Sequence, residues 1–466
     1  MTTMKRESTR VMRLNLPQQG RDGFRRSGPI ATIVLFLTLC TSLSAQEPIT
    51  YAELVEQLEP YFAAELIGDV KLALPKGAFQ VWGFGVGDYS ADGYNDLVLS
   101  IRMGSDRDNK MRVYYFVDIE GMLELVRQEA AHFVELPIEV GVTVGDGNAY
   151  LLYKRKDKGW EIFGRRFEDG VIMLVDRFTV EQNVALIHEQ SRNFQLLEGY
   201  DRYLRVRDEQ QVFRTDFLTI PSYRRGRHVS AGYAQTATAD ASGYIMKGAY
   251  YRSSEEDAGL HVRSAWDADY LYYNIMVDDE EIVPYADGDE TTGDRVEIWI
   301  DTYLYGDRLT TGARRQDFRM ESDTNIYGLQ IDLGDFADRE PAVSVTTTNI
   351  FDDEQNRATR KVKAIAARRD GGWSLKVRIP YELFGLTEPP IDPEKLVEIG
   401  STVIAHDLDN PWRPVEVTTL ATSFNFDSDK PATFGALVLV PSALHYGEAE
   451  NIYLPQVKER LDEVGF

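Results

Sequence analysis

Short runs of aromatic and β-branched residues, separated by turns rich in glycine, aspartate and asparagine, recur along most of this chain. Between residues 79 and 180 they include FQVWGFGVGD, DLVLSIRM and MRVYYFVDI, and a second series runs from residue 244 to FGALVLVPS. Many of these runs alternate apolar with polar residues, which places the apolar side chains on one face of a strand. Short strands joined by tight turns are typical of meandering antiparallel sheets. We therefore expect a mainly β protein.

The order of the runs predicts two β-rich domains. The segment ITYAELVEQLEPYFAAELIGD has the apolar spacing of a helix and opens the first domain, whereas VEQNVALIHEQSRNFQLLEGYDRYL is mixed and compatible with a helix. We expect a smaller β-rich domain over 46–215, a linker or long loop over 216–243, an antiparallel, jelly-roll-like β-sandwich over 244–441, and a C-terminal tail over 442–466 with a short helix.

Residues 1–45 resemble a secretory signal in their order of features. Arg25 and Arg26 precede an apolar run that ends in the small residues TSLSA, and we expect cleavage after Ala45. A membrane anchor would need about 18 or more apolar residues, which this run lacks. A lipoprotein signal at Cys40 is the other alternative, although Leu39 is larger than the residue that usually precedes such a cysteine. The mature protein should be exported to the periplasm, the outer surface or the medium.

The mature chain should be strongly acidic. Removal of residues 1–45 takes seven basic and two acidic residues from totals of 51 and 75, which leaves a net charge near −29. Nucleic acid and anionic membranes are therefore poor partners, and no later apolar stretch is long enough to span a bilayer. The only cysteine, Cys40, leaves with the signal, so stability must come from the core, hydrogen bonds and metal ions.

The stretch VGDYSADGYNDLVLSI combines closely spaced acidic side chains with the start of a strand. Its oxygen-bearing side chains, together with a backbone carbonyl near Tyr94, suit the six to eight oxygen ligands that calcium takes. Gly93 can adopt the positive φ that such a tight loop needs. The predicted ligands of a structural calcium ion are Asp88, Ser90, Asp92, Tyr94 and Asp96; the alternative is an acidic turn without metal.

This loop is similar to one FG-GAP or VCBS-type repeat, whose loop binds calcium in propeller-like extracellular proteins. The resemblance covers about twenty residues, FGVGDYSADGYNDLVL and its surroundings. The later stretch VGVTVGDGNAYLLY echoes its start but lacks the acidic residues that follow. A complete propeller is therefore not expected.

A second resemblance covers residues 244 to 441. Five segments follow one another there: AWDADYLYYNIMVDDEEI, GDRVEIWIDT, GGWSLKVRIPYELFGL, GSTVIAHDLDN and PATFGALVL. In this order they resemble family 9 carbohydrate-binding modules. The resemblance implies a β-sandwich that binds the ends of polysaccharides or oligosaccharides.

Strand alternation in GDRVEIWID places Arg295, Glu297, Trp299 and Asp301 on one face. A flat aromatic ring beside carboxylates suits sugar recognition, because the ring stacks on a pyranose while charged groups bind its hydroxyls. The alternative is that Trp299 packs between the sheets and that its charged neighbours are solvated at the rim.

Glu297 matches the sugar-contacting glutamate of the family, but the two sandwiching tryptophans of the family are missing. The aromatic residues available in the corresponding loops are Tyr285, Phe424 and Phe426, and Trp412 in the stiff stretch NPWRP is a further platform candidate.

The sequence lacks a recognisable catalytic constellation. It contains no G-x-S-x-G or H-E-x-x-H motif and no nucleotide-binding glycine loop, and its six histidines are scattered. We therefore expect a non-catalytic, exported carbohydrate-binding protein. The alternatives are a cell-envelope scaffold whose sugar site has degenerated and, since two carboxylates suffice for glycoside hydrolysis, a glycoside hydrolase. Haem binding, as in related sandwich modules, is a further alternative.

Overall fold

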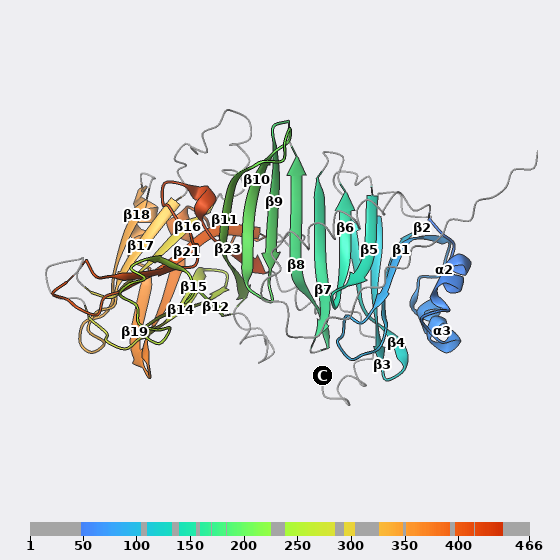
Figure 1. The fold of residues 1–466 in the computed structure, drawn as a ribbon, viewed down its shortest axis with the longest axis horizontal. Coiled ribbons are helices and arrows are strands. Elements are labelled where there is room, and N and C mark those ends of the chain that lie inside the picture. The colour runs from blue at the N-terminus through green and yellow to red at the C-terminus, as the bar shows by residue number, and fades with distance from the viewer. Residues whose placement is uncertain are drawn as a thin grey trace, which may run out of the picture. The chain divides into compact units, whose positions relative to one another are not determined.

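The fold consists mainly of β-strands, which agrees with the expected class (Figure 1). The computed structural model describes residues 48–103, 110–132, 139–154, 159–168, 170–182, 184–224, 238–284, 293–302, 326–347, 351–391, 397–413 and 415–440. The expected signal and C-terminal tail lie outside these residues. None of the helices within them is long and apolar enough to cross a membrane.

Two short helices cover the first sheet. They are α2 (Tyr51–Leu58), which begins with a capping box between Thr50 and Glu53, and α3 (Ala64–Ala73). The sequence predicted one helix here, and the chain makes two because it leaves the helical path in the turn around Pro60. Their apolar faces pack on an antiparallel meander, with strands β1 (Phe79–Gly87), β2 (Asp96–Met103), β3 (Lys110–Ile119) and β4 (Met122–His132).

A seven-stranded antiparallel meander follows. Its strands are β5 (Glu139–Gly145), β6 (Asn148–Lys154), β7 (Trp160–Glu168), β8 (Val171–Gln182), β9 (Leu186–Asn193), β10 (Glu198–Arg205) and β11 (Gln211–Arg224). Strands β9 and β10 occupy the segment whose mixed pattern was compatible with a helix. Side chains such as Val98 and Tyr115 of the first sheet pack against Val142 and Leu151 of this one.

Strand β11 belongs to two sheets. Its first half pairs with β10, and its second half runs parallel to β23 (Ala436–Val440) and to β14 (Ala258–Trp266). The strand therefore occupies residues 216–224 of the range in which we expected a linker, and residues 225–237 lie outside the description. The described residues between 48 and 440 belong to one compact unit.

Two antiparallel sheets make up the rest of the fold. One has the order β19-β20-β15-β14, with β12 beside β14. The other has the order β18-β17-β16-β21, after which β21 pairs with both β22 and β23, and β13 pairs with β22.

The strands of these two sheets are β12 (Ala239–Asp240), β13 (Ile245–Lys247), β15 (Tyr270–Asp279), β16 (Arg295–Asp301), β17 (Ile326–Asp332), β18 (Ala342–Thr347), β19 (Lys363–Arg369), β20 (Gly372–Pro380), β21 (Val397–Asp407) and β22 (Thr418–Ala421). Short helical segments are α6 (Asp353–Thr359), η2 (Tyr381–Phe384) and η3 (Pro431–Thr433). Inward side chains of both sheets share one core, for example Val262, Ile275 and Val377 from one sheet and Ile298, Leu329 and Val403 from the other. This arrangement confirms the β-sandwich.

Candidate functional site

Strand β16 turns alternate side chains toward opposite sides of its sheet. The three apolar residues between Arg295 and Asp301 are fully buried in the sandwich core, as the alternation predicted. Glu297 and Trp299 lie on the outer face and are partly exposed. Asp301 differs from the expectation, because it is fully buried at the end of the strand. Trp299 is therefore accompanied by one accessible carboxylate on this face instead of two.

The Glu297 carboxylate is held by two ring nitrogens. Its Oε2 accepts a hydrogen bond from Trp299 Nε1 at 2.8 Å, and its Oε1 lies 2.9 Å from His406 Nε2. Burial alone would raise the pKa of Glu297, but the His406 and Trp299 contacts outweigh it and the pKa is lowered. Glu297 is thus a positioned carboxylate that stays ionised at neutral pH. His406 was one of the histidines that the sequence left without a role.

The Trp299 ring is wedged between two neighbours. On β17, a side chain at Gly328 would begin 2.8 Å from the ring, so glycine is what lets the indole lie flat over this strand. Phe426 packs on Trp299 with ring centroids 5.7 Å apart, and Phe434 meets Phe426 edge-on at 5.0 Å. Glu297 and Phe426, two of the predicted sugar-binding residues, are therefore linked through Trp299. Phe424 is half exposed and touches Tyr244 instead.

Among the described residues, Trp412 and Phe424 do not join this group. Trp412 precedes strand β22, whereas Phe424 and Phe426 follow it, so they lie at opposite ends of that strand. Tyr285 lies outside the described residues.

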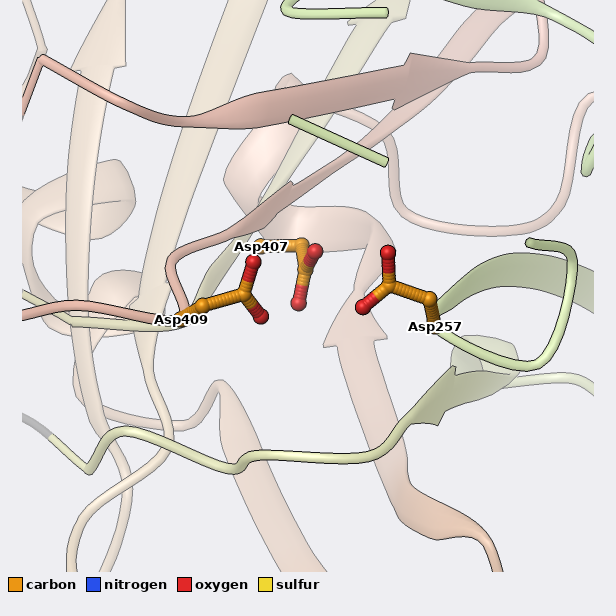
Figure 2. A group of neighbouring side chains, drawn as sticks. All are labelled: Asp257, Asp407 and Asp409. Atoms are coloured by element: carbon orange, nitrogen blue, oxygen red, sulfur yellow. The ribbon is translucent and has the colours of Figure 1, made fainter. Parts of the chain in front are cut away.

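Five aspartates converge at one edge of the sandwich, and the sequence reading did not identify them. We call them the acidic centre: Asp257, Asp279, Asp294, Asp407 and Asp409. They form two overlapping groups, Asp257–Asp407–Asp409 (Figure 2) and Asp279–Asp294–Asp407, and within each group ligand oxygens lie within 4.8 Å of one another. Figure 2 shows Asp257 facing the other two from a separate segment of the chain.

Strand pairing explains why residues so far apart in sequence meet. Asp279 ends β15 and Asp407 ends β21, while Asp257 immediately precedes β14 and Asp294 immediately precedes β16. β14 pairs with β15, and β16 with β21, in both cases antiparallel. The start of one strand therefore lies beside the end of its partner.

Three members of the acidic centre accept hydrogen bonds, and one of them, Asp257, accepts from the Ser253 amide. Asp279 accepts hydrogen bonds from Trp373 Nε1 at 2.9 Å and from the Glu281 amide at 2.9 Å. Asp294 accepts them from the amides of Val283 at 2.7 Å and Leu408 at 2.9 Å. These bonds fix where these carboxylates point.

Asp407 has no such support. It is 2% exposed, and among the described residues neither of its carboxylate oxygens has a hydrogen-bond partner; the same holds for Oδ1 of Asp409. Burial, together with the charges of Asp279 and Asp409, raises the pKa of Asp407 to about 9, although Arg252 lowers it somewhat. Burial and neighbouring acids raise that of Asp409 to about 6. Buried charges are normally paired or bound to metal, and carboxylate oxygens are the ligands that calcium prefers.

The predicted calcium loop has a different character. Asp96 is buried and accepts hydrogen bonds from the amides of Tyr89 at 2.8 Å, Ser90 at 2.9 Å and Asp118 at 3.0 Å. It thus closes the loop through backbone amides.

The other acidic side chains of this loop also bind amides. Asp88 accepts from Gly93 at 3.0 Å and Asp92 from Tyr94 at 2.8 Å. The Ser90 hydroxyl lies 3.4 Å from Asp88. Among the described residues, these acids do not form a group as close as the acidic centre. Calcium at this loop stays a prediction.

Comparisons with known proteins give structural likeness only. No model of a protein family matches the chain, and no curated protein matches it significantly. Among solved structures, it is similar to a family 9 carbohydrate-binding module from Caldicellulosiruptor kristjanssonii in complex with cellotriose, with 13% identity, a TM-score of 0.31, and coverage of 51% of this chain and 98% of that one. A structure of a family 9 module from the same organism in complex with glucose has 15% identity, a TM-score of 0.30, and coverage of 48% and 95%. TM-scores of this size carry no functional argument.

Proposed function

We propose that this chain is an exported, non-catalytic saccharide-binding protein whose site is the outer face of β16 and β21. The observation that carries the proposal is the positioned carboxylate of Glu297, fixed between Trp299 and His406 and still partly exposed. A carboxylate that is ionised and oriented in advance forms strong hydrogen bonds with hydroxyl groups. The sequence resemblance to family 9 modules points to the same glutamate.

The competing function is a scaffold that has lost its sugar site. It is favoured by the way Trp299 is covered by Phe426 and lies over Gly328, which leaves less of the indole face for a sugar ring. The two functions differ in whether free oligosaccharide binds at all.

Calorimetry with cello- and xylo-oligosaccharides at millimolar concentration tests the proposal. Glu297→Gln should weaken binding by about ten- to a hundredfold, because a hydrogen bond to a charged group contributes about 1.5–3 kcal/mol. Glu388→Gln, at an exposed position of the same domain, should bind like the native protein. Heat from none of these sugars would favour the scaffold.

We also propose that the acidic centre binds a divalent cation, with calcium the best fit to an all-oxygen set. Asp407 carries this proposal, because its buried carboxylate accepts no hydrogen bond from the part of the chain that the structure describes and faces four other acids. A cation would supply the missing partner and offset the repulsion among them. The role is structural: it would hold the ends of four strands together.

Thermal melts with calcium and with chelator test this second proposal. A ligand that binds only the folded state at a hundredfold excess over its Kd stabilises it by about 2.7 kcal/mol. Asp407→Asn should remove most of this gain and, in chelator, should melt above the native chain, because the neutral amide avoids the cost of burying and protonating this carboxyl on folding. Asp338→Asn, at an exposed position, is the matched control. Equal calcium stabilisation of native protein and Asp407→Asn would contradict the site.

A further inference from the structure

Two loops leave the sandwich beside the acidic centre and carry strongly exposed aromatic rings. The first, residues 248–257, bears Tyr250 and Tyr251, and the second, which follows β21, bears Trp412 within residues 408–413. Tyr250 is 98% exposed and Trp412 is 91% exposed, while Tyr251 is 44% exposed. Large apolar side chains are seldom this accessible without a reason when several occur close together. We call these three residues the loop surface.

The loops meet at one end through backbone contacts. They extend from strands β13 and β22, which pair antiparallel. The Thr418 hydroxyl lies 3.4 Å from the carbonyl oxygen of Gly248. Any side chain at Gly248 would begin 2.0 Å from the carbonyl oxygen of Val417, and φ at Gly248 is +81°. Only glycine permits this approach.

At the other end the loops meet at the acidic centre. Asp257, at the end of the first loop, faces Asp407 and Asp409, at the start of the second (Figure 2). Arg252 lies near Asp407 and offsets part of its charge, but the acids outnumber it. The carboxyl groups of the two loops therefore lie close enough to share one cation, which would join the loops at this point.

Trp412 is held within its own loop by short-range bonds. The Asn410 side chain accepts from the Trp412 amide at 3.0 Å, and the Arg413 amide donates to the Asn410 carbonyl at 2.9 Å. Arg413 and Glu416 form an exposed ion pair at 3.0 Å. Local hydrogen bonds thus fix the backbone that carries the indole. The distance between the indole and the two tyrosine rings depends on how the two loops are joined.

We propose that the loop surface is a second saccharide-binding site, built when a divalent cation in the acidic centre joins the two loops. This inference rests on the proposed cation site, and its ligand class is that of the proposed function. Exposed rings bordered by the polar groups of Arg413 and Glu416 provide stacking and hydrogen bonds together. The net charge of −24 and the excess of carboxylates over one divalent ion disfavour anionic ligands. The expected ligand is therefore a neutral polysaccharide chain.

The test uses the full chain with cellohexaose and xylohexaose as probes, titrated by calorimetry in calcium and in chelator. Trp412→Ala should weaken the calcium-dependent part of binding by about tenfold, with an unchanged melting temperature because the side chain is exposed. Tyr250→Ala should act in the same direction. Tyr61→Ala, at a tyrosine that is 53% exposed between α2 and α3, is the matched control and should bind normally.

The outcomes separate this site from the face around Glu297. If the inference holds, Glu297→Gln retains a calcium-dependent component that the double variant with Trp412→Ala lacks, and Asp407→Asn loses that component. Native affinity in Trp412→Ala, or an equal effect of chelator on Trp412→Ala and native protein, would overturn it and leave the Glu297 site standing. Self-association that disappears in Trp412→Ala, without any change in sugar binding, would overturn it in favour of a protein contact. No binding by the native chain would contradict both sites.

Discussion

A buried ion network joins the seven-stranded meander to the sandwich, and its removal gives a strong test of how the fold is held together. Arg192 on β9 binds Glu398 on β21 through Nη2 at 2.9 Å and Nε at 3.1 Å, and it also reaches Asp201 at 3.0 Å. Arg177 on β8 adds a contact to Glu398 at 3.4 Å. The Arg192 and Glu398 side chains are nearly inaccessible. We predict that Glu398→Gln destabilises the protein severely.

The expected magnitude follows from what the substitution leaves behind. Breaking a buried ion pair by removing one partner costs about 3–5 kcal/mol, because the remaining charge is left uncompensated. Asp201 still accompanies Arg192 in the variant, so the lower end, about 3 kcal/mol, applies. Glutamine keeps the side-chain volume and one acceptor oxygen of Glu398, so the change in the free energy of unfolding comes from the lost charge.

Equilibrium unfolding in urea measures this loss, and pH provides a second reading. Burial alone would raise the pKa of Glu398, but Arg192 and Arg177 hold it below its usual value of 4.5. A lowered folded pKa means that the stabilisation is present above pH 4.5 and is lost as pH falls through the folded pKa. The gap between native protein and Glu398→Gln should therefore narrow in acid.

The matched control is Glu382→Gln, at a carboxylate that pairs with Lys361 on the surface. Exposed ion pairs contribute little to stability, so this variant should unfold like the native protein. If Glu398→Gln changed the free energy of unfolding by less than about 1 kcal/mol at pH 7, the network would not be a structural link between the two parts.

Three further predictions concern other sites. Burial raises the pKa of Asp176 from 3.8 to about 6, so its ionisation costs stability as pH rises through that interval, and Asp176→Asn should remove this loss in pH-dependent melts. Gly85→Ala should lower the free energy of unfolding by about 2 kcal/mol or more, since its Cβ would lie 2.7 Å from the backbone of Thr143, whereas Gly145→Ala, which meets nothing within 4 Å, should be tolerated. If the first acidic loop binds calcium, Asp92→Ala should reduce the calcium-induced rise in melting temperature; an identical rise in both proteins would exclude it.

The sequence predicted best what depends on neighbouring residues. Period-two alternation placed Glu297 and Trp299 on the outer face of β16, and turn residues between apolar runs predicted the antiparallel sheets. The alternation failed at Asp301, because the strand ends there and the side chain is buried. The single helix became two for an equally local reason at Pro60.

The acidic centre could not be predicted from the local sequence pattern. Its five aspartates lie between residues 257 and 409, and each looks like an ordinary acidic residue at a strand end. Their convergence depends on which strands pair, and pairing between distant segments leaves little local signal. The contact of His406 with Glu297 could not be predicted for the same reason, since it requires β16 and β21 to be neighbours. Trp412 could be recognised as a platform candidate in a stiff stretch, but not assigned to a particular end of β22.

Because strand β11 pairs in two sheets, it limits where this protein can be divided into fragments. A fragment that starts at residue 244, where the repeated strand pattern of the sandwich begins, would lack the residues 219–224 that pair with β23 and β14. Both strands would then present unpaired backbone groups along a freshly opened edge, which favours aggregation. A soluble sandwich fragment should therefore begin before Thr219. The edge of β11 that pairs with β10 in the intact protein would also have to be protected in such a fragment.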